Sequence, residues 1–529
     1  MSNNSGRDLT HNLILPTLLF AVLGGMTWAV RGCSGFGASA GCIFAGVTWG
    51  TAWWFIARDP CGKQSRRYAS GWIILALTVG FGIAGDRGWM QWPHFFNNRL
   101  YTDFSEGEFV PISRAYGFLW LFLAGVPWAG IGACMLAWCG SGRRTSPWQW
   151  LLRVACGFGM AYFLGVFLYN RLPEVFLPLY STIKERCHDL QANPNLRKLV
   201  RDNGEGMWQM GLYLGFLVFE IARRDWKNVK LILTVGVVNG LGWALCQNWM
   251  WAARLWPTAN FNFWRSWETS GGISIGIAYG IAYYLVNRRL SDKEIATQES
   301  RMAGQPSAEV RRGSLAPAGL RALLPSLYWL GAYLVLVVLL GWLATEIMTA
   351  WYACCFALVG AAFGISYYVT IRRTSQEERA HLETGWPAGN PNLERWGAYT
   401  GLVLGLGLSV KNGLKGWANI YLGNEAYWER IFWNVIGPLM LVCLVALVAR
   451  LLFRPAPRGF QGDVFPHAYR LIWLVLITQN LIAQLITGPH TSWSEVAFSI
   501  YYVLLFFVSA VIIYHYQFVK VHCSPQESV

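Results

Sequence analysis

Seven polar or charged residues of this chain could bind a polar or anionic substrate, because each lies near the end of a long apolar segment. They are Arg31, Asp86, Arg87, Gln247, Asn248, Lys411 and Asn412. A charge at the centre of a membrane helix costs about 2.5 to 3.5 kcal/mol, so such a residue needs a partner or a water-filled cavity. The functional interpretation is one shared polar cavity that opens outward. The structural alternative is interfacial anchoring, or an ion pair of Asp86 with Arg31 or Lys411.

The same residues belong to a weak internal repeat, in which small residues precede a polar group near the end of an apolar segment. The copies are Gly24-Gly25 before Arg31-Gly32, Gly80-Phe81-Gly82 before Asp86-Arg87-Gly88, Gly240-Leu241-Gly242 before Gln247-Asn248, Gly405-Leu406-Gly407 before Lys411-Asn412, and a last one that keeps only Gln479-Asn480. Corresponding ends of repeated units can converge around one axis, so the repeat favours a common site.

A second recurring feature is a tryptophan near an acid at the start of several apolar segments. The matches are Trp267-Glu268, Trp428-Glu429, Trp493-Ser494-Glu495 and, more loosely, Glu205 with Trp208. An acid in the first turn of a helix complements the helix dipole, and a tryptophan anchors a helix end at the membrane interface. We therefore interpret these acids as structural.

The segment 32–41 is rich in glycine and interrupts the helical pattern beside Arg31. Backbone amides there, together with the start of the following helix, could hold a carboxylate or a phosphate. A tight turn between two helices needs the same glycines, so this alternative stays open.

Conventional catalytic and metal-binding patterns are missing from the sequence. It contains no Gly-x-Ser-x-Gly elbow and no phosphate-binding loop of the Walker type. None of His94, His188 and His490 has a second histidine or cysteine at metal-ligand spacing, so we predict no metal, and no cofactor is identified. An enzyme acting on a lipid or a lipid-linked glycan at the outer leaflet would draw its acids and bases from a small set. That set is Asp86, His94, Glu106, Glu108 and Glu174.

The elements that position these residues are membrane helices. Of 529 residues, 54% are hydrophobic and 13% are charged, which is typical of an integral membrane protein. We predict an all-α bundle of about fourteen transmembrane helices, built from seven tandem helical hairpins. The predicted helices span about residues 12–31, 36–57, 71–90, 114–139, 148–170, 206–223, 228–250, 269–287, 325–348, 351–371, 394–411, 430–452, 468–487 and 494–517.

Lysine and arginine concentrate in alternate connections of this pattern. The basic connections are 58–67, 143–153, 223–230, 288–321, 372–395 and 450–470. Under the positive-inside rule they lie in the cytoplasm together with both termini, which predicts a multi-pass protein of the inner (cytoplasmic) membrane. Topology thus accounts for most of the net charge of +15, and binding of nucleic acid is not predicted.

The predicted organisation has two membrane regions. Residues 1–290 hold about eight helices and two long extracytoplasmic loops, 88–113 and 171–205; residues 291–323 form a cytoplasmic linker containing Ser, Ala, Gly and Pro; residues 324–520 hold about six helices; and residues 521–529 form a short cytoplasmic tail. Most of the twelve cysteines lie in apolar segments, where we interpret them as packing residues. Cys33 and Cys187 fall on the predicted outer side, where one disulfide bond could form.

These patterns favour translocation of a polar or anionic solute, or of a lipid-linked substrate, through a cavity between helical hairpins. Its partners would be the lipid bilayer and a polar, anionic or glycolipid substrate, and the sequence does not define the oligomeric state. A carrier also needs polar groups near the bilayer midplane, for which the candidates are Thr48, Thr234, Asn239, Ser274 and Ser409. The alternatives are the outer-leaflet enzyme and a structural subunit that binds another membrane protein.

Overall fold

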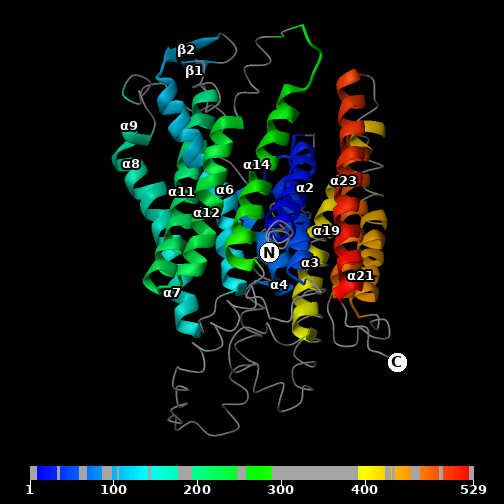
Figure 1. Ribbon diagram of the computed structural model, residues 1–529. Helices are drawn as coiled ribbons and strands as arrows, with labels where there is room; N and C mark the ends of the chain where they lie inside the picture. Colours follow the sequence, from blue (N-terminus) through cyan, green and yellow to red (C-terminus); the bar gives the residue numbers. More distant parts are fainter. Residues whose placement is uncertain are drawn as a thin grey trace, which may run out of the picture. The chain divides into compact units, whose positions relative to one another are not determined.

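The structure is a computed structural model of residues 1–529. It describes residues 9–32, 36–58, 68–85, 98–103, 107–140, 145–176, 181, 194–246, 256, 258–288, 391–422, 431, 435–453, 465–487 and 492–523. Apart from one pair of short strands, the elements in these residues are helices. The axes of the long helices are roughly aligned with one another (Figure 1). The elements are η1 (Thr10–Ile14), α2 (Leu15–Arg31), α3 (Ala38–Ala57), α4 (Trp72–Ala84), β1 (Arg99–Asp103), β2 (Glu108–Pro111), α6 (Arg114–Gly140), α7 (Pro147–Tyr162), η2 (Phe163–Leu168), α8 (Tyr169–Arg171), α9 (Pro173–Phe176), α11 (Pro194–Ala222), α12 (Trp226–Cys246), α14 (Phe263–Asn287), α19 (Pro391–Tyr421), α21 (Gly437–Phe453), α22 (Phe465–Leu485) and α23 (Trp493–Cys523).

Eight helices of the described residues are long and apolar enough to cross a membrane, which supports an all-α, multi-pass membrane protein. They are Thr10–Arg31, Ser39–Ala57, Arg114–Gly140, Trp148–Arg171, Trp226–Cys246, Phe263–Asn287, Phe465–Leu485 and Trp493–Tyr516. Four further predicted spans are helical but shorter or less apolar, namely α4, α11, α19 and α21. The remaining two, 325–348 and 351–371, lie outside the described residues, so fourteen spans stay a prediction.

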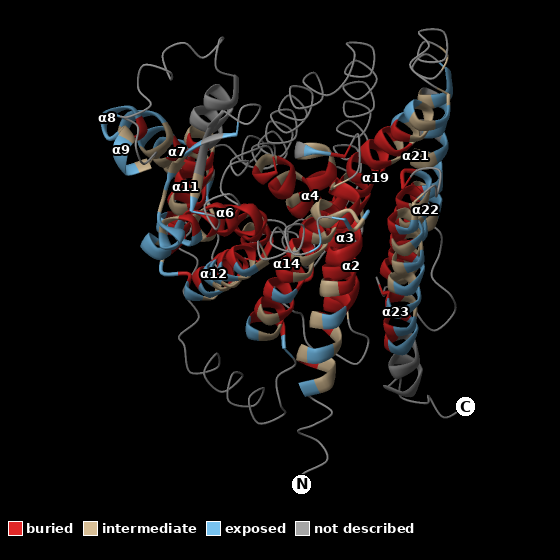
Figure 2. Ribbon diagram, turned by 90° about the horizontal axis from the view of Figure 1, so that it is seen from above, coloured by how far each residue is buried: buried red, intermediate tan, exposed pale blue. Residues whose placement is uncertain are grey.

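Burial separates the helices into inner and outer ones. The α3 helix is almost completely buried, whereas α7 and α23 expose much of their apolar surface (Figure 2). Exposed apolar side chains such as Leu151, Phe158, Leu504 and Phe507 would be unfavourable in water but suit a lipid environment. The burial pattern therefore agrees with the membrane class.

Glycines join α2 to α14 in a close helix crossing. A Cβ atom at Gly272 would overlap the carbonyl oxygen of Gly24, and one at Gly276 would overlap that of Phe20. Gly280 packs in the same way on Thr17. Small residues four apart let two helix backbones approach this closely. Because residue numbers rise on α14 as they fall on α2, the two helices are antiparallel, and the end of α2 meets the start of α14.

Helices that follow the predicted linker pack on helices that precede it. The α19 helix runs antiparallel to α3, because Glu394 contacts Trp54 and Gly405 lies against Val47. The α22 helix does so too, because Phe465 packs on Phe55 and Gln479 bonds to Phe44. The α23 helix packs on α2, and the ring of its His515 stacks on His11 of η1 with centroids 5.3 Å apart. We call the contact of α2, α3 and α4 with α19, α22 and α23 the junction. The linker itself lies outside the described residues.

Both long predicted loops contain regular structure. Strands β1 and β2 form an antiparallel hairpin inside 88–113. The hairpin directly precedes α6 in the chain and lies next to the first turns of that helix (Figure 1). The predicted loop 171–205 is partly helical, because it contains α9 and because α11 begins at Pro194 rather than at 206. Proline is favoured in the first turn, and the polar turns that follow are invisible to hydropathy. The α14 helix likewise begins at Phe263 rather than at 269, where the side chain of Asn262 accepts a hydrogen bond from the Arg265 amide.

We predict that Gly272→Ala destabilises the protein by about 1 to 3 kcal/mol, because the added methyl group forces α2 and α14 apart. The matched control is Gly159→Ala in α7, where a Cβ atom meets nothing within 4 Å. Alanine there should be neutral or stabilising by about 0.5 to 1 kcal/mol. Thermal denaturation of both variants in detergent measures the difference. Equal midpoints would show that the glycine contact does not hold the helices together.

Candidate functional site

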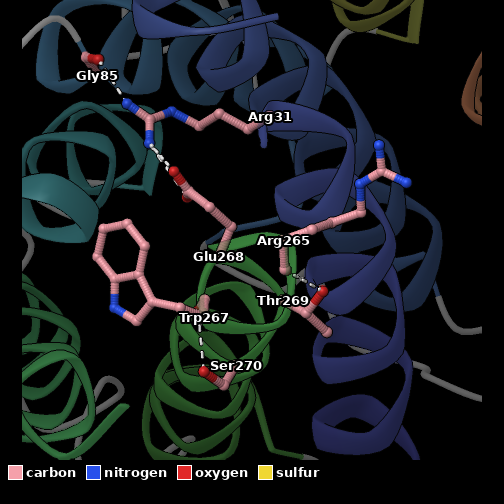
Figure 3. Close-up of polar contacts among 7 residues, drawn as sticks. All are labelled: Arg31, Gly85, Arg265, Trp267, Glu268, Thr269 and Ser270. Carbon is pink, nitrogen blue, oxygen red and sulfur yellow. Dashed lines mark hydrogen bonds and ion pairs between the residues drawn. The ribbon is translucent and has the colours of Figure 1, made fainter. Parts of the chain in front are cut away.

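The candidate site is built around a buried ion pair between Arg31 and Glu268. Arg31 is the last residue of α2, and its guanidinium donates hydrogen bonds to both carboxylate oxygens of Glu268 at 3.1 and 3.2 Å. It also donates to the carbonyl oxygen of Gly85, directly after α4, at 3.2 Å (Figure 3). Arg31 is 5% exposed and Glu268 is 2% exposed. One side chain thus ties together the ends of α2, α4 and α14.

Aromatic rings surround the ion pair. The guanidinium carbon of Arg31 lies 4.4 Å from the ring centroid of Trp128 and 5.5 Å from that of Trp28. Trp243 packs on Trp128 at 4.6 Å, and Trp267 packs on Trp243 at 5.4 Å. These four tryptophans form the tryptophan cluster. Their rings stabilise the cation and exclude water, which strengthens the attraction between the charges.

Glycines let the helix ends converge on Arg31. A Cβ atom at Gly41, on the first turn of α3, would overlap the Arg31 side chain. One at Gly85 would overlap Cys42. Gly41 therefore serves close packing around Arg31. The α3 helix starts after Gly37, which is its N-cap. Residues 33–35 lie outside the described residues, so both the tight-turn and the anion-binding interpretations of the segment stay hypotheses.

The seven predicted site residues divide into two groups. Asp86, Arg87, Gln247 and Asn248 lie outside the described residues. Arg31, Lys411 and Asn412 are described, and all three are buried. Since α19 is antiparallel to α3 with Gly405 against Val47, six further residues bring Lys411 to the level of Gly41. Lys411 and Asn412 therefore lie toward the same end of the bundle as Arg31.

The residue that sequence reasoning missed is Glu268. We expected Asp86 as the acid for Arg31 and interpreted Glu268 as a helix-start acid, but Glu268 is the carboxylate that contacts Arg31 in the described residues. Because α14 begins at Phe263, five residues before Glu268, Glu268 lies in the second turn of the helix and faces α2. One signal could have found it: Glu268 precedes Gly272 by four residues and so shares the glycine-lined face of the helix.

Two further arginine–carboxylate pairs use the same chemistry. Arg58, directly after α3 and partly exposed, donates from Nε to a carboxylate oxygen of Glu394 at 2.6 Å, and the indole of Trp54 donates to the same oxygen at 2.5 Å. Arg153 of α7, which is buried, donates twice to Glu220 of α11, at 3.0 and 2.6 Å. Arg58 lies at the opposite end of the antiparallel pair α2 and α3 from Arg31. Arginine–carboxylate pairs thus join helices at both ends.

The junction contains polar groups near the middle of α3. The amide nitrogen of Gln479 donates to the Phe44 carbonyl and to the Thr48 hydroxyl, both at 3.1 Å. Among the buried atoms of α19 and α22 that have no hydrogen-bond partner within the described part of the chain are the amide oxygen of Gln479 and, nearer the Arg31 end, the amide nitrogen of Asn412. Ser409 also lies in α19 on the Gly405 face, because it follows Gly405 by one turn and donates to its carbonyl at 2.7 Å. Of the predicted midplane groups, Thr48 and Ser409 therefore belong to the junction.

Other midplane candidates pair with each other outside the junction. Ser274 donates to Asn239 at 3.3 Å, and Asn239 donates to the Gly125 carbonyl at 2.6 Å. These bonds join α14, α12 and α6. They satisfy the polar groups internally, so Asn239 and Ser274 serve packing.

The acid–base candidates of an enzyme are only partly described. Glu108 lies in β2, and Glu174 in α9 accepts a hydrogen bond from the Ser181 amide. Asp86, His94 and Glu106 lie outside the described residues, as do Cys33 and Cys187. No group of three metal-ligating side chains occurs in the residues that the structure describes. The free thiols are Cys42, Cys134, Cys139, Cys156, Cys246 and Cys443.

Comparisons with known proteins add no functional information. The chain matches no protein-family model, no curated protein and no solved structure.

We predict that Glu268→Leu destabilises the protein by about 3 to 5 kcal/mol, because it leaves a buried guanidinium without its carboxylate. The double variant Arg31→Met with Glu268→Leu should be more stable than Glu268→Leu alone, since it removes both charges. The exposed Arg171 supplies the control: Arg171→Met should change stability by no more than about 0.5 kcal/mol. A double-mutant cycle by thermal denaturation tests this, and additive losses would contradict a coupled pair.

Proposed function

We propose that the protein translocates a polar or anionic solute, or a lipid-linked substrate, across the membrane through a cavity that opens between its helical hairpins at the junction. The support comes from where polar groups lie within an otherwise apolar bundle. The substrate would pass along α3, α19 and α22.

One observation carries this proposal: the junction holds polar atoms whose hydrogen-bonding capacity the described residues do not use. The oxygen of Gln479 can accept a hydrogen bond, and the nitrogen of Asn412 can donate one. Leaving such a group buried without a partner costs about 1 to 3 kcal/mol. A substrate with donors and acceptors of its own would remove that cost. Gln479 also bonds to the Thr48 hydroxyl in the middle of α3. A carrier needs polar groups at this level, because its substrate binds near the bilayer midplane.

Separate contacts close the two ends of the junction. At one end, Arg58 binds Glu394 between α3 and α19. Beside the other end, the residues that precede α14 contact α23: the Asn262 amide donates to the Ser494 hydroxyl at 3.0 Å, and Phe261 stacks on Trp493 with centroids 4.9 Å apart. Because the contacts are independent, either end could open while the other stays closed, which is the requirement of alternating access. The glycine crossing of α2 and α14 would move as one rigid body.

The proposal includes the finer topology. It has fourteen helices in seven hairpins, a cytoplasmic linker at 291–323 between two membrane regions, both termini in the cytoplasm, and the inner membrane as location. The distribution of lysine and arginine supports this arrangement. Of the alternatives, neither the outer-leaflet enzyme nor the structural subunit has a specific contact in its favour among the described residues.

Accessibility of the junction from the two sides of the membrane tests the proposal. Ser409 is 1% exposed, and among the described residues its hydroxyl bonds only within its own helix, so Ser409→Cys should fold normally. We expect a membrane-impermeant maleimide to label the S409C thiol in proteoliposomes when it is added from either side, because each end opens in turn. Peptide mass spectrometry separates this label from that of the native cysteines. Ser274→Cys, outside the junction, is the matched control and should stay unlabelled.

Two other outcomes would contradict translocation. Labelling of the S409C thiol from one side alone would favour a one-sided active site. Absence of labelling from both sides would favour a static structural subunit.

A further inference from the structure

Arg265 is a buried arginine without a carboxylate in the described residues. It is the third residue of α14, it is 6% exposed, and its Nε atom has no hydrogen-bond partner within the described part of the chain. The carboxylate of Glu268, one turn later, binds Arg31 instead. Figure 3 shows the Arg265 guanidinium directed away from that pair. Its described side-chain contact is the ring of Phe498, 4.9 Å from the guanidinium carbon.

This contact does not neutralise the charge. A cation–π interaction stabilises a buried cation by less than the burial of its charge costs. Arg31 and Arg153, the other arginines buried to this degree among the described residues, each bind a carboxylate. The exception at Arg265 therefore calls for an anion that is not part of the described chain.

The surroundings of Arg265 indicate the depth of the site. Phe261 stacks on Trp493, whose side chain is 58% exposed at the start of α23. Exposed tryptophans at helix ends mark the level of the lipid headgroups. On α23, the apolar side chains of Val496 and Ile500 are also exposed, where acyl chains would lie. A phosphate at this level meets the guanidinium and the positive end of the α14 dipole together.

We propose that Arg265 binds the phosphate of an anionic lipid headgroup between α14 and α23. The fork of the guanidinium can donate two parallel hydrogen bonds to phosphate oxygens, a geometry that lysine cannot reproduce. Free inorganic phosphate carries the same group but lacks the acyl chains. The site does not depend on translocation, because a protein that moves nothing across the membrane could still bind this headgroup.

The test is a binding titration on the full-length protein in phosphatidylcholine–detergent micelles. One arm adds phosphatidylglycerol and the other adds inorganic phosphate, with thermal stability and native mass spectrometry as readouts. We expect phosphatidylglycerol to raise the melting midpoint and to stay bound in the mass spectrum. Arg265→Gln should bind it about tenfold more weakly, and Arg265→Lys should fall between that variant and the wild type. Arg171→Gln is the matched control, since Arg171 is an exposed arginine that also lies near a ring, that of Phe167, and it should bind like wild type.

Every outcome decides the proposal. Equal binding by wild type and Arg265→Gln would overturn it, as would absence of bound phosphatidylglycerol from the wild-type protein. A response to inorganic phosphate as strong as that to the lipid would overturn the lipid as the ligand. If Arg265→Gln does not fold, the comparison of wild type with Arg265→Lys takes its place, and equal affinity of those two would refute bidentate binding. Labelling at S409C is measured separately, so failure of the lipid site and failure of translocation can be told apart.

Discussion

A charged arginine inside an apolar bundle must be neutralised, and this constraint decides where the helices of the protein meet. Arg31 satisfies it with Glu268 and with the Gly85 carbonyl, so α2, α4 and α14 must end or begin at one place. Beside this ion pair, the glycines of α2 and α14 let the two backbones approach closely. The tryptophan cluster fills the space that remains beside the charges.

The two kinds of helix contact in the bundle have different physical properties. Between α2 and α14 the backbones touch, so that a small displacement would meet steric resistance at Gly24 and Gly272. At the junction, α3 meets α22 through two hydrogen bonds of Gln479, which can exchange for bonds to water or to a ligand, and through the packing of Phe55 on Phe465. Glycines also bring backbones together there, since a Cβ atom at Gly71 would overlap the carbonyl oxygen of Glu394. The junction therefore combines both kinds of contact.

Hydropathy predicted most of the fold because a membrane span has a fixed length and an apolar composition. The helices Thr10–Arg31 and Ser39–Ala57 lie where the sequence indicated. The polar first turns of α11 escaped prediction, since nothing in their composition resembles a span, and the start of α14 at Phe263 depended on a cap that hydropathy ignores. Arg31 was selected as a candidate site residue because of the cost of its charge in a bilayer. Its partner was missed, because Glu268 matches the pattern of a helix-start acid and only its spacing of four residues from Gly272 indicated the face that meets α2.

That separation has a consequence for how the protein is made. Arg31 and Glu268 are 237 positions apart, so at roughly 5 to 20 residues per second the ribosome needs about 12 to 47 seconds to supply the partner. During this interval the first helix enters the membrane with an arginine that has not met its carboxylate. The translocon or an insertion chaperone would have to shelter it, or the helix would wait near the interface. Full insertion of α2 into the membrane would therefore depend on the synthesis of α14. The helices around Arg31 would pack together late in biogenesis.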